Sequence, residues 1–185
     1  MGMNYLIHLS QNIKVSAGAP PQNVYGADVS LDFINLGYEL FLDQDKLGVK
    51  FITADLFNTA STLFTEFTGR LDIIHATNFF QQWEWDRQIE AAKLIIKLLV
   101  NKPGSMIIGS QVGSKRAREI EFVAIDGSAF MHSTKSFKIL WDRVSRDTGI
   151  PFDVQVTETT FSEQAAYGWQ EELEHFRLIF TIRKI

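Results

Sequence analysis

The stretch Val24-Tyr25-Gly26-Ala27-Asp28-Val29 decides the fold, because it is a short apolar run that closes on an acid and leads into an amphipathic segment. Residues 31–42 carry apolar side chains at helical spacing, and Ser30 before them is a good N-cap residue. A second apolar run, Val49–Ala54, follows and is closed by Asp55. A strand, a helix and a strand in this order predict a βαβ unit of a parallel sheet. The predicted inward face of the helix is Leu31, Ile34, Tyr38, Phe41 and Leu42.

The same alternation continues along the chain. Leu71–Ala76 and Ser105–Gly109 are further near-continuous apolar runs, as a parallel strand covered on both faces requires. Helical periodicity occupies Asp86–Val100 and Ser136–Thr148, and each segment is followed by a glycine and a proline that end it. The run Phe176–Lys184 alternates, which is typical of an antiparallel strand. The sequence therefore predicts an α/β fold with a Rossmann-like open sheet, mostly parallel with an antiparallel strand near the C-terminus, and helices on both faces.

Length and composition restrict the classes of function. The chain has 185 residues, so we expect a single domain over 1–185 in which residues 1–17 are atypical. Its 18 basic and 22 acidic side chains give a net charge of −4, which argues against a nucleic-acid or anionic-membrane surface. The sequence has no cysteine and no paired histidines, so no metal site is expected. No run approaches the ~20 apolar residues of a membrane span, and the expected location is the cytoplasm.

Two carboxylates, Asp28 and Asp55, stand at the carboxyl ends of neighbouring predicted strands. Ligands of open α/β sheets bind outside these ends, and a carboxylate there can accept hydrogen bonds from both hydroxyls of a ribose. An acid at the next strand end can accept a hydrogen bond from an adenine amino group. The plain alternative is that both acids cap the helices that follow them. Spacing alone favours neither interpretation.

Several motifs, in this order and at this spacing, resemble one group of proteins. They are Tyr25-Gly26-Ala27-Asp28, Phe33–Phe41, Ala54-Asp55-Leu56-Phe57, Asp72–Ala76, Phe79–Asp86, Pro103–Gly113 and His132–Gly149. Together they are similar to fungal class I S-adenosylmethionine-dependent methyltransferases of meroterpenoid and related secondary-metabolite pathways. The resemblance covers residues 18–185 and implies a methyltransferase with S-adenosylmethionine as its cofactor.

The same resemblance implies roles for particular residues. Asp28 with Val29 would bind the ribose of the cofactor, and Asp55 with Leu56 and Phe57 would bind its adenine. Thr77 and Asn78 would line the methionine end and the transfer site. His75 ends the fourth predicted strand near the expected methyl group and is the candidate catalytic residue, because an imidazole can take a proton or orient an acceptor oxygen. The plain alternative for His75 is a core histidine.

The start of the chain departs from the family pattern. The family's first strand runs into a glycine-rich loop that approaches the methionine moiety, whereas Asn4–Lys14 contains no glycine. Relative to that pattern we expect the chain to be N-terminally truncated, without the family's helical N-terminal region. Tyr5–Leu9 is expected to fill the central strand position, because an empty position would leave backbone groups unpaired. We expect cofactor binding to be weakened or lost.

Four further features have both a functional and a structural interpretation. His132 could reach the substrate entrance or be an ordinary loop histidine. The glycines of Gly109–Gly113 could let a substrate approach the backbone or could form a turn. The charged stretch Ser114–Glu121 is expected to be a solvated loop. An aromatic cluster could be the wall of a hydrophobic pocket or part of the core, and it consists of Phe79, Phe80, Trp83 and Trp85.

The sequence therefore predicts an S-adenosylmethionine-dependent methyltransferase that acts on a carboxylate or hydroxyl oxygen of a small hydrophobic secondary metabolite. The expected partners are this substrate and a second copy of the chain in a homodimer, with no nucleic acid and no membrane. The missing glycine-rich loop keeps two alternatives open. One is an inactive methyltransferase-like remnant, and the other is a cofactor-independent cyclase or isomerase that reuses the fold.

Overall fold

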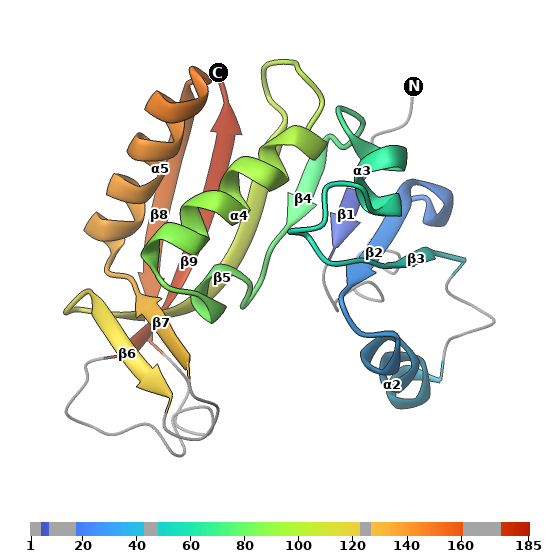
Figure 1. Cartoon of the computed structure of the whole chain (residues 1–185), viewed down its shortest axis with the longest axis horizontal. Helices are drawn as coiled ribbons and strands as arrows, with labels where there is room; N and C mark the ends of the chain where they lie inside the picture. The colour runs from blue at the N-terminus through green and yellow to red at the C-terminus, as the bar shows by residue number, and fades with distance from the viewer. Residues whose placement is uncertain (1–4, 8–17, 43–47, 123–126, 161–174) are drawn as a thin grey trace. The chain divides into compact units, whose positions relative to one another are not determined.

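The computed structural model describes residues 5–7, 18–42, 48–122, 127–160 and 175–185 (Figure 1). The chain divides into two compact units. Unit 1 comprises residues 1–75 and 94–106, and unit 2 comprises residues 76–93 and 107–185. The single domain expected over 1–185 stays a prediction.

Unit 1 contains a parallel sheet with the strand order β3-β2-β1-β4. Its strands are β1 (Tyr5–Ile7), β2 (Val24–Asp28), β3 (Lys50–Thr53) and β4 (Ile73–His75). Because β1 pairs with β2 on one side and β4 on the other, it supplies the backbone partners that both neighbours need. The first strand expected at Tyr5–Leu9 is confirmed for Tyr5–Ile7, and the rest of the glycine-free stretch lies outside the described residues.

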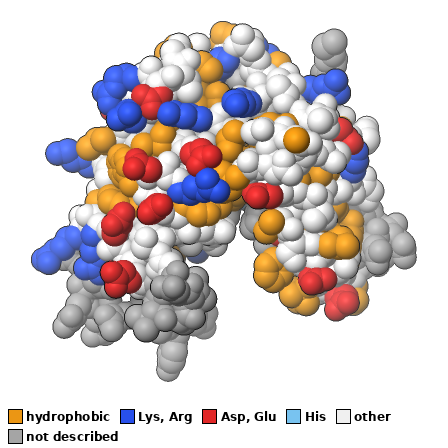
Figure 2. Space-filling model, in the orientation of Figure 1, with side chains coloured by type: hydrophobic (Ala, Val, Ile, Leu, Met, Phe, Trp, Pro, Cys, Tyr) orange, Lys and Arg blue, Asp and Glu red, His pale blue; other side chains and the backbone are white. Residues whose placement is uncertain are grey.

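Helix α2 (Leu31–Phe41) is less buried than the sequence predicts. Ile34 is buried and the ring of Tyr38 packs edge-on against Phe51 of β3, with ring centroids 5.0 Å apart. The prediction is wrong for the other three residues of the inward face, because each is more than half exposed: Leu31, Phe41 and Leu42. Phe33, Leu36 and Leu40 are exposed to the same degree, and Figure 2 shows hydrophobic side chains gathered on the surface over α2. Only one line of side chains reaches the sheet from this helix.

Helix α3 (Thr62–Phe67) and the part of α4 (Trp85–Leu98) from Leu94 onward pack more completely than α2, whereas the 3₁₀ turn η1 (Pro21–Asn23) buries none of its residues. Phe67 of α3 is buried and its ring meets Tyr25 of β2 with centroids 4.6 Å apart. These contacts place α3 against the sheet.

Helix α4 (Trp85–Leu98) begins in unit 2 and continues into unit 1 at Leu94. The helix predicted over Asp86–Val100 is thus confirmed to within two residues at its C-terminal end. Its predicted inward residues are all buried: Ile89, Ala92, Ile96 and Leu99. The chain then turns through Gly104, whose φ of +89° lies in the region that favours glycine.

Unit 2 contains a sheet portion with the order β5-β9-β8. Its strands are β5 (Met106–Ser114, within unit 2 from Ile107), β8 (Phe152–Thr159) and β9 (His175–Lys184). The expectation of an antiparallel C-terminal strand is confirmed, because β8 and β9 pair antiparallel from Phe152 opposite Lys184 to Thr159 opposite Arg177. The buried face of β9 is the one predicted from its alternation: Phe176, Leu178, Phe180 and Ile182.

Helix α5 (Thr134–Thr148) lies alongside β8 in Figure 1 and covers this portion of the sheet. It starts with a capping box, in which the Ser133 side chain accepts from the Ser136 backbone N–H and the Ser136 side chain accepts from Ser133. It ends at Gly149, whose φ is +67°. The four side chains predicted to face inward are completely buried: Phe137, Leu140, Trp141 and Val144. Capping residues and apolar spacing therefore act together here.

A β-hairpin replaces part of a predicted loop in unit 2. Strands β6 (Arg118–Phe122) and β7 (Gly127–Met131) pair antiparallel, with Ile120 opposite Ala129. The prediction of a loop over Ser114–Glu121 is therefore wrong for its second half, although most of its side chains are exposed as expected. The charged residues of this stretch do not by themselves indicate that two exposed strands pair in a hairpin.

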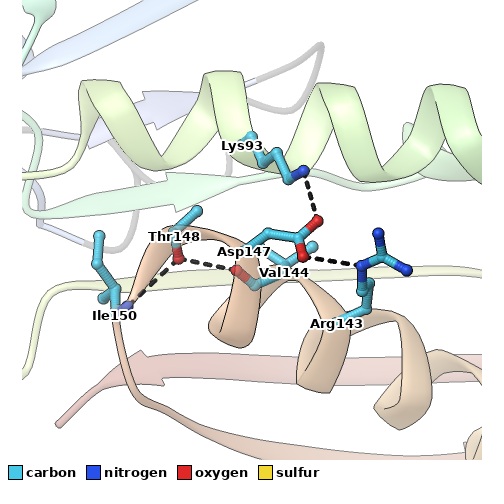
Figure 3. A network of polar contacts seen from close by, with 6 residues as sticks. All are labelled: Lys93, Arg143, Val144, Asp147, Thr148 and Ile150. Atoms are coloured by element: carbon cyan, nitrogen blue, oxygen red, sulfur yellow. Dashed lines mark hydrogen bonds and ion pairs between the residues drawn. The ribbon is translucent and has the colours of Figure 1, made fainter.

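A surface network joins α4 to α5 within unit 2 (Figure 3). The Asp147 carboxylate accepts from the Lys93 ammonium at 2.6 Å and from Arg143 Nε at 2.8 Å. The hydrogen bonds from these two cations lower the pKa of Asp147 below its ordinary value. None of the helices in the described residues is long and apolar enough to span a membrane.

Candidate active site

Asp28 and Asp55 lie at adjacent strand ends in unit 1. The Ala54 backbone N–H donates to the Asp28 carbonyl at 2.9 Å, so the residue that precedes Asp55 is bonded directly to Asp28. Asp28 is 7% exposed and ends β2, whereas Asp55 is exposed just beyond β3. The structure therefore brings both acids to the carboxyl edge of two neighbouring parallel strands, as their position in the sequence predicts.

Each of the two carboxylates accepts a hydrogen bond from the backbone two residues further on. Asp28 Oδ1 accepts from the Ser30 N–H and Asp55 Oδ1 accepts from the Phe57 N–H, both at 2.9 Å. These are Asx-turn bonds, and neither donor lies inside a helix. The alternative that both acids cap the following helices is therefore wrong. The turns hold each carboxylate in one orientation at its strand end.

The apolar residues assigned to the cofactor flank these acids. Val29 is 68% exposed, while Leu56 and Phe57 are half-buried. Apolar surface beside a carboxylate is suited to the face of a flat ring whose edge carries hydrogen-bond donors. The geometry of this part of unit 1 is thus compatible with an adenosyl group.

The other assigned residues are distributed over both units. His75 ends β4 in unit 1, where it lies half-buried opposite Ile7 of β1. Thr77 is half-buried and Asn78 is exposed, and both belong to unit 2. The Asn78 N–H donates to the Ser110 carbonyl of β5 at 2.7 Å, and its φ of +51° is uncommon for a residue other than glycine. A strained backbone next to a strand end is frequent at functional sites.

The glycines of β5 serve protein packing. A Cβ on Gly109 would lie 2.3 Å from the Ala76 carbonyl oxygen and 2.7 Å from the Phe180 ring. A Cβ on Gly113 would lie 2.7 Å from the Phe176 ring. Both glycines lie inside β5, so the alternative of a turn is wrong, and the space beside them is filled by protein.

The predicted aromatic cluster separates into core and edge. Phe80 is completely buried, and its ring meets those of Phe137, Trp141 and Phe180 at centroid distances of 6.3, 6.0 and 6.1 Å. Phe79 is half-buried, with its ring 5.0 Å from that of Trp83. For Phe80, therefore, the core interpretation is right.

His132 is completely buried in unit 2, so both interpretations, a residue that reaches a substrate entrance and an ordinary loop histidine, are wrong. Its Nε2 lies 3.0 Å from Gln88 Oε1, and its Nδ1 lies 2.9 Å from Ser136 Oγ. Gln88 Nε2 donates to the Trp83 and Phe130 carbonyls, which leaves its oxygen to accept from His132 Nε2–H. Burial lowers the pKa of His132 from 6.5 to about 3, so this imidazole is neutral.

Gln88 was missed at the sequence level, although the sequence contains a signal for it. Gln88 stands one position before Ile89 and four before Ala92, on the buried side of an amphipathic helix. A polar residue at such a position needs internal partners. Which carbonyls and which histidine would satisfy it could not be read from the sequence, because they lie up to 44 residues away.

The described residues contain no group of histidine, aspartate and glutamate side chains that could hold a metal ion. No protein-family model matches the chain.

Curated relatives are fungal methyltransferases. The O-methyltransferase phiE of a fungal species is 37% identical over 142 residues, which is 77% of this chain and 47% of the relative. The methyltransferase ausD of Penicillium brasilianum is 36% identical over 143 residues, 76% of this chain and 51% of the relative. The O-methyltransferase atr3 of Stereocaulon alpinum is 30% identical over 164 residues, 88% of this chain and 46% of the relative. The chain spans about half the length of these relatives.

Solved structures show the same fold at low sequence identity. Phosphoethanolamine N-methyltransferase 2 of Haemonchus contortus, in complex with S-adenosyl-L-methionine, has a TM-score of 0.64 at 14% identity and covers 100% of this chain and 49% of that one. The [4+2]-cyclase SpnF has a TM-score of 0.66 at 13% identity, covering 99% and 76%. The magnesium protoporphyrin IX methyltransferase of Synechocystis, with bound SAM, has a TM-score of 0.59 at 15% identity, covering 100% and 71%.

These likenesses confirm the predicted Rossmann-like α/β fold and the predicted resemblance. The relatives matched in sequence are named methyltransferases or O-methyltransferases of fungi. Over about three quarters of its length the chain is similar in sequence to fungal methyltransferases, and it has the Rossmann-like fold of S-adenosylmethionine-dependent methyltransferases.

Proposed function

We propose that the chain binds S-adenosylmethionine and transfers its methyl group to an oxygen of a small hydrophobic secondary metabolite. The observation that carries this proposal is the pair Asp28 and Asp55 at adjacent strand ends. Two of the three curated relatives described above are named O-methyltransferases, which supports oxygen as the acceptor atom.

The carboxylates would bind the nucleoside of the cofactor. Asp28 would accept from the ribose hydroxyls, because a carboxylate offers paired acceptor oxygens and this one ends β2. Asp55 would accept from the adenine amino group, with Leu56 and Phe57 against the ring. Val29 would cover the ribose, and Thr77 with Asn78 would line the methionine end.

The chemical step requires little from the protein beyond positioning. S-adenosylmethionine, when bound, supplies an electrophilic methyl group. Holding an acceptor oxygen in line with such a group can lower a barrier by roughly 7–11 kcal/mol. A carboxylate acceptor needs no base, whereas a hydroxyl acceptor would give its proton to His75.

One alternative function is favoured by a specific likeness. SpnF, a [4+2]-cyclase, shares the fold over 99% of this chain. A cyclase would use the apolar surroundings of the site without methyl transfer. It would show substrate turnover with no S-adenosylhomocysteine produced, which distinguishes the two functions. An inactive remnant would show neither product.

We also propose a homodimer. The exposed apolar side chains of α2 support it, since contiguous apolar surface of this kind marks interaction sites. Sedimentation analysis between low and high micromolar concentration tests the homodimer directly. A single monomeric species over that range would contradict it.

A thermal-shift titration tests cofactor binding. S-adenosylmethionine at ~100 times its dissociation constant should add about 2.7 kcal/mol, or roughly 5–10 °C in Tm. Asp28→Asn and Asp55→Asn should each weaken binding by roughly 10- to 100-fold, because an amide keeps the Asx-turn oxygen but loses the charge.

Asp32→Asn is the matched control, because it removes one negative charge from the first turn of α2. It should leave the shift unchanged. No shift with the unmodified chain at millimolar S-adenosylmethionine, or equal losses in all three variants, would contradict the proposed function.

A further inference from the structure

A cavity in unit 2 lies between the start of α5 and the end of β8, apart from the residues proposed to bind the cofactor. Its volume is about 460 Å³, and it is lined by Thr134, Lys135 and Lys138 of α5 and by Val156 and Glu158 of β8. All five residues belong to unit 2. Pockets for small ligands begin at about 300 Å³, so this cavity is large enough for a small organic molecule.

Both walls of the cavity are fixed by the fold. The start of α5 is held by the capping box of Ser133 and Ser136, and β8 is paired with β9 along its whole length. α5 lies alongside β8 (Figure 1), and the Phe152 ring of β8 meets the buried Trp141 ring of α5 with centroids 5.7 Å apart. The cavity is therefore formed by two rigid elements, as a precise binding site requires.

The cavity lies at the carboxyl edge of the strands of unit 2. Lys115 follows directly on β5, and its ammonium group forms an ion pair with Glu158 near the end of β8. The carboxyl ends of β5 and β8 therefore lie at the same edge, and Glu158 lines the cavity there. Open α/β sheets bind their ligands outside this edge, so the cavity occupies a position at which a ligand is expected.

The charges around the cavity favour an anion. Lys135 and Lys138 are exposed, and neither ammonium group has an ion-pair partner among the described residues. The Glu158 carboxylate is paired with Lys115. Two ammonium groups and one carboxylate line the cavity, which gives its lining side chains a net charge of +1. The Thr134 hydroxyl adds a further hydrogen-bond donor for an anion.

We propose that this cavity binds a small organic acid through its carboxylate, with Lys135 and Lys138 as the cationic partners and the apolar part of the acid against Val156. A lysine ammonium group is a compact charge with three donors and can bind a carboxylate from several directions. A dianion such as a phosphate ester would bring its second charge toward Glu158, so a single negative charge is favoured. This inference does not rest on the proposed function, because neither the cofactor nor any residue of unit 1 takes part.

An NMR titration with benzoate tests the site. The saturable shifts of backbone amide signals should be largest at the residues that line the cavity. Lys135→Gln and Lys138→Gln should each weaken benzoate binding by roughly 3- to 10-fold, because one charge pair with the carboxylate is lost. Arg146→Gln is the matched control, because it removes an exposed positive charge from α5 outside the cavity, and it should leave the affinity unchanged.

Benzamide is the neutral counterpart of benzoate in the same titration. It should bind at least about 10-fold more weakly than benzoate, and added salt should weaken only the binding of benzoate. Equal affinities of the two probes would overturn the proposal. So would equal affinities of benzoate for the unmodified chain and both lysine variants, or the absence of a saturable shift at the residues of the cavity.

Glu158→Gln tests the preference for a single charge. It removes the carboxylate from the cavity wall and should strengthen benzoate binding by roughly 2- to 5-fold. Phenyl phosphate, measured as the dianion, should bind the unmodified chain no more tightly than benzoate and should gain more from the substitution. Tighter binding of phenyl phosphate than of benzoate to the unmodified chain, or no gain in Glu158→Gln, would overturn the assignment of a carboxylate.

The two proposals fail separately. Lys138→Gln should keep the full thermal shift with S-adenosylmethionine, because the carboxylates of unit 1 are untouched. Loss of that shift in the unmodified chain would contradict the proposed function while benzoate still bound. Loss of benzoate binding, with the thermal shift intact, would overturn the organic-acid site alone.

Discussion

Units 1 and 2 carry similar apolar patterns but bury them to different degrees. In unit 2 the four inward side chains of α5 are completely buried. The rings of Phe137 and Trp141 meet that of Phe80, and Phe137 also meets Phe180. In unit 1 helix α2 buries Ile34 alone and leaves Leu40 72% exposed.

The difference teaches that an apolar stripe predicts a helix but does not by itself predict what covers it. Unit 2 contains both α5 and the β8–β9 pair, and α5 packs against β8. The acids proposed to bind the cofactor lie instead in the unit whose helix is less covered. We therefore expect the stability of the fold to reside mainly in unit 2.

The largest effect should come from the core of unit 2. Trp141→Ala should lower the free energy of unfolding by about 3–5 kcal/mol, because it leaves a cavity among packed rings. Leu40→Ala on α2 should change it by less than about 0.5 kcal/mol. Urea unfolding at low protein concentration measures both. An equal cost of the two variants would remove the contrast between the units.

Acid should weaken unit 2 through His132. Its pKa is about 3 in the folded protein and 6.5 as an ordinary value, so the unfolded chain takes up a proton first as the pH falls. The contribution of the neutral imidazole is full above pH 6.5 and declines below it, by about 1.4 kcal/mol per pH unit, or about 2 kcal/mol at pH 5. Urea midpoints at pH 7, 6 and 5 measure this slope.

His132→Gln provides the comparison for that slope. The variant should be less stable at pH 7, since the contacts to Gln88 and Ser136 change. Its stability should nevertheless depend less steeply on pH between 6.5 and 5. Parallel slopes for the variant and the unmodified chain would show that His132 is not the titrating group.

Two N-cap serines, one in each unit, allow a comparison of α5 with α2 in which the expected change in stability is smaller. Ser133 caps α5 through its side chain, whereas the Ser30 side chain makes no capping hydrogen bond to α2. Ser133→Ala should cost about 1 kcal/mol and Ser30→Ala only a few tenths. Thermal unfolding of both variants tests this ranking, and the reverse order would contradict the geometry of the two helix starts.

The smallest effect should come from the surface network of α4 and α5. Asp147→Asn removes the acceptor of Lys93 and Arg143 and should lower Tm by less than about 2 °C. The difference should vanish in 1 M salt, because exposed charges are screened. A difference that persists in high salt would mean that Asp147 is held by more than these two cations.

Much of the fold could be predicted because local signals agreed with it. The Ser133 cap, the apolar spacing of α5 and the terminal Gly149 all specify one helix, and the alternation of β9 specifies its buried face. The burial of α2 could not be predicted, since it depends on which neighbours meet the helix. The hairpin β6–β7 was missed because pairing across an exposed hairpin leaves little trace in composition.

The candidate site could be predicted only at its strand ends. Asp28 and Asp55 follow from the positions where apolar runs stop, and their bonded neighbours confirm that they are adjacent. Their Asx turns depend on backbone angles that the sequence does not specify. The sequence does not show which buried polar side chains have hydrogen-bond partners, because those partners are distant in sequence. Gln88 and His132 have such partners, whereas the Gln111 amide has none among the described residues.

A crystal structure with S-adenosylhomocysteine tests the adenosyl site most directly. We predict that a carboxylate oxygen of Asp28 lies within hydrogen-bonding distance of a ribose hydroxyl and that Asp55 approaches the adenine amino group. A nucleoside bound elsewhere, or one whose ribose is contacted by neither acid, would contradict the assignment.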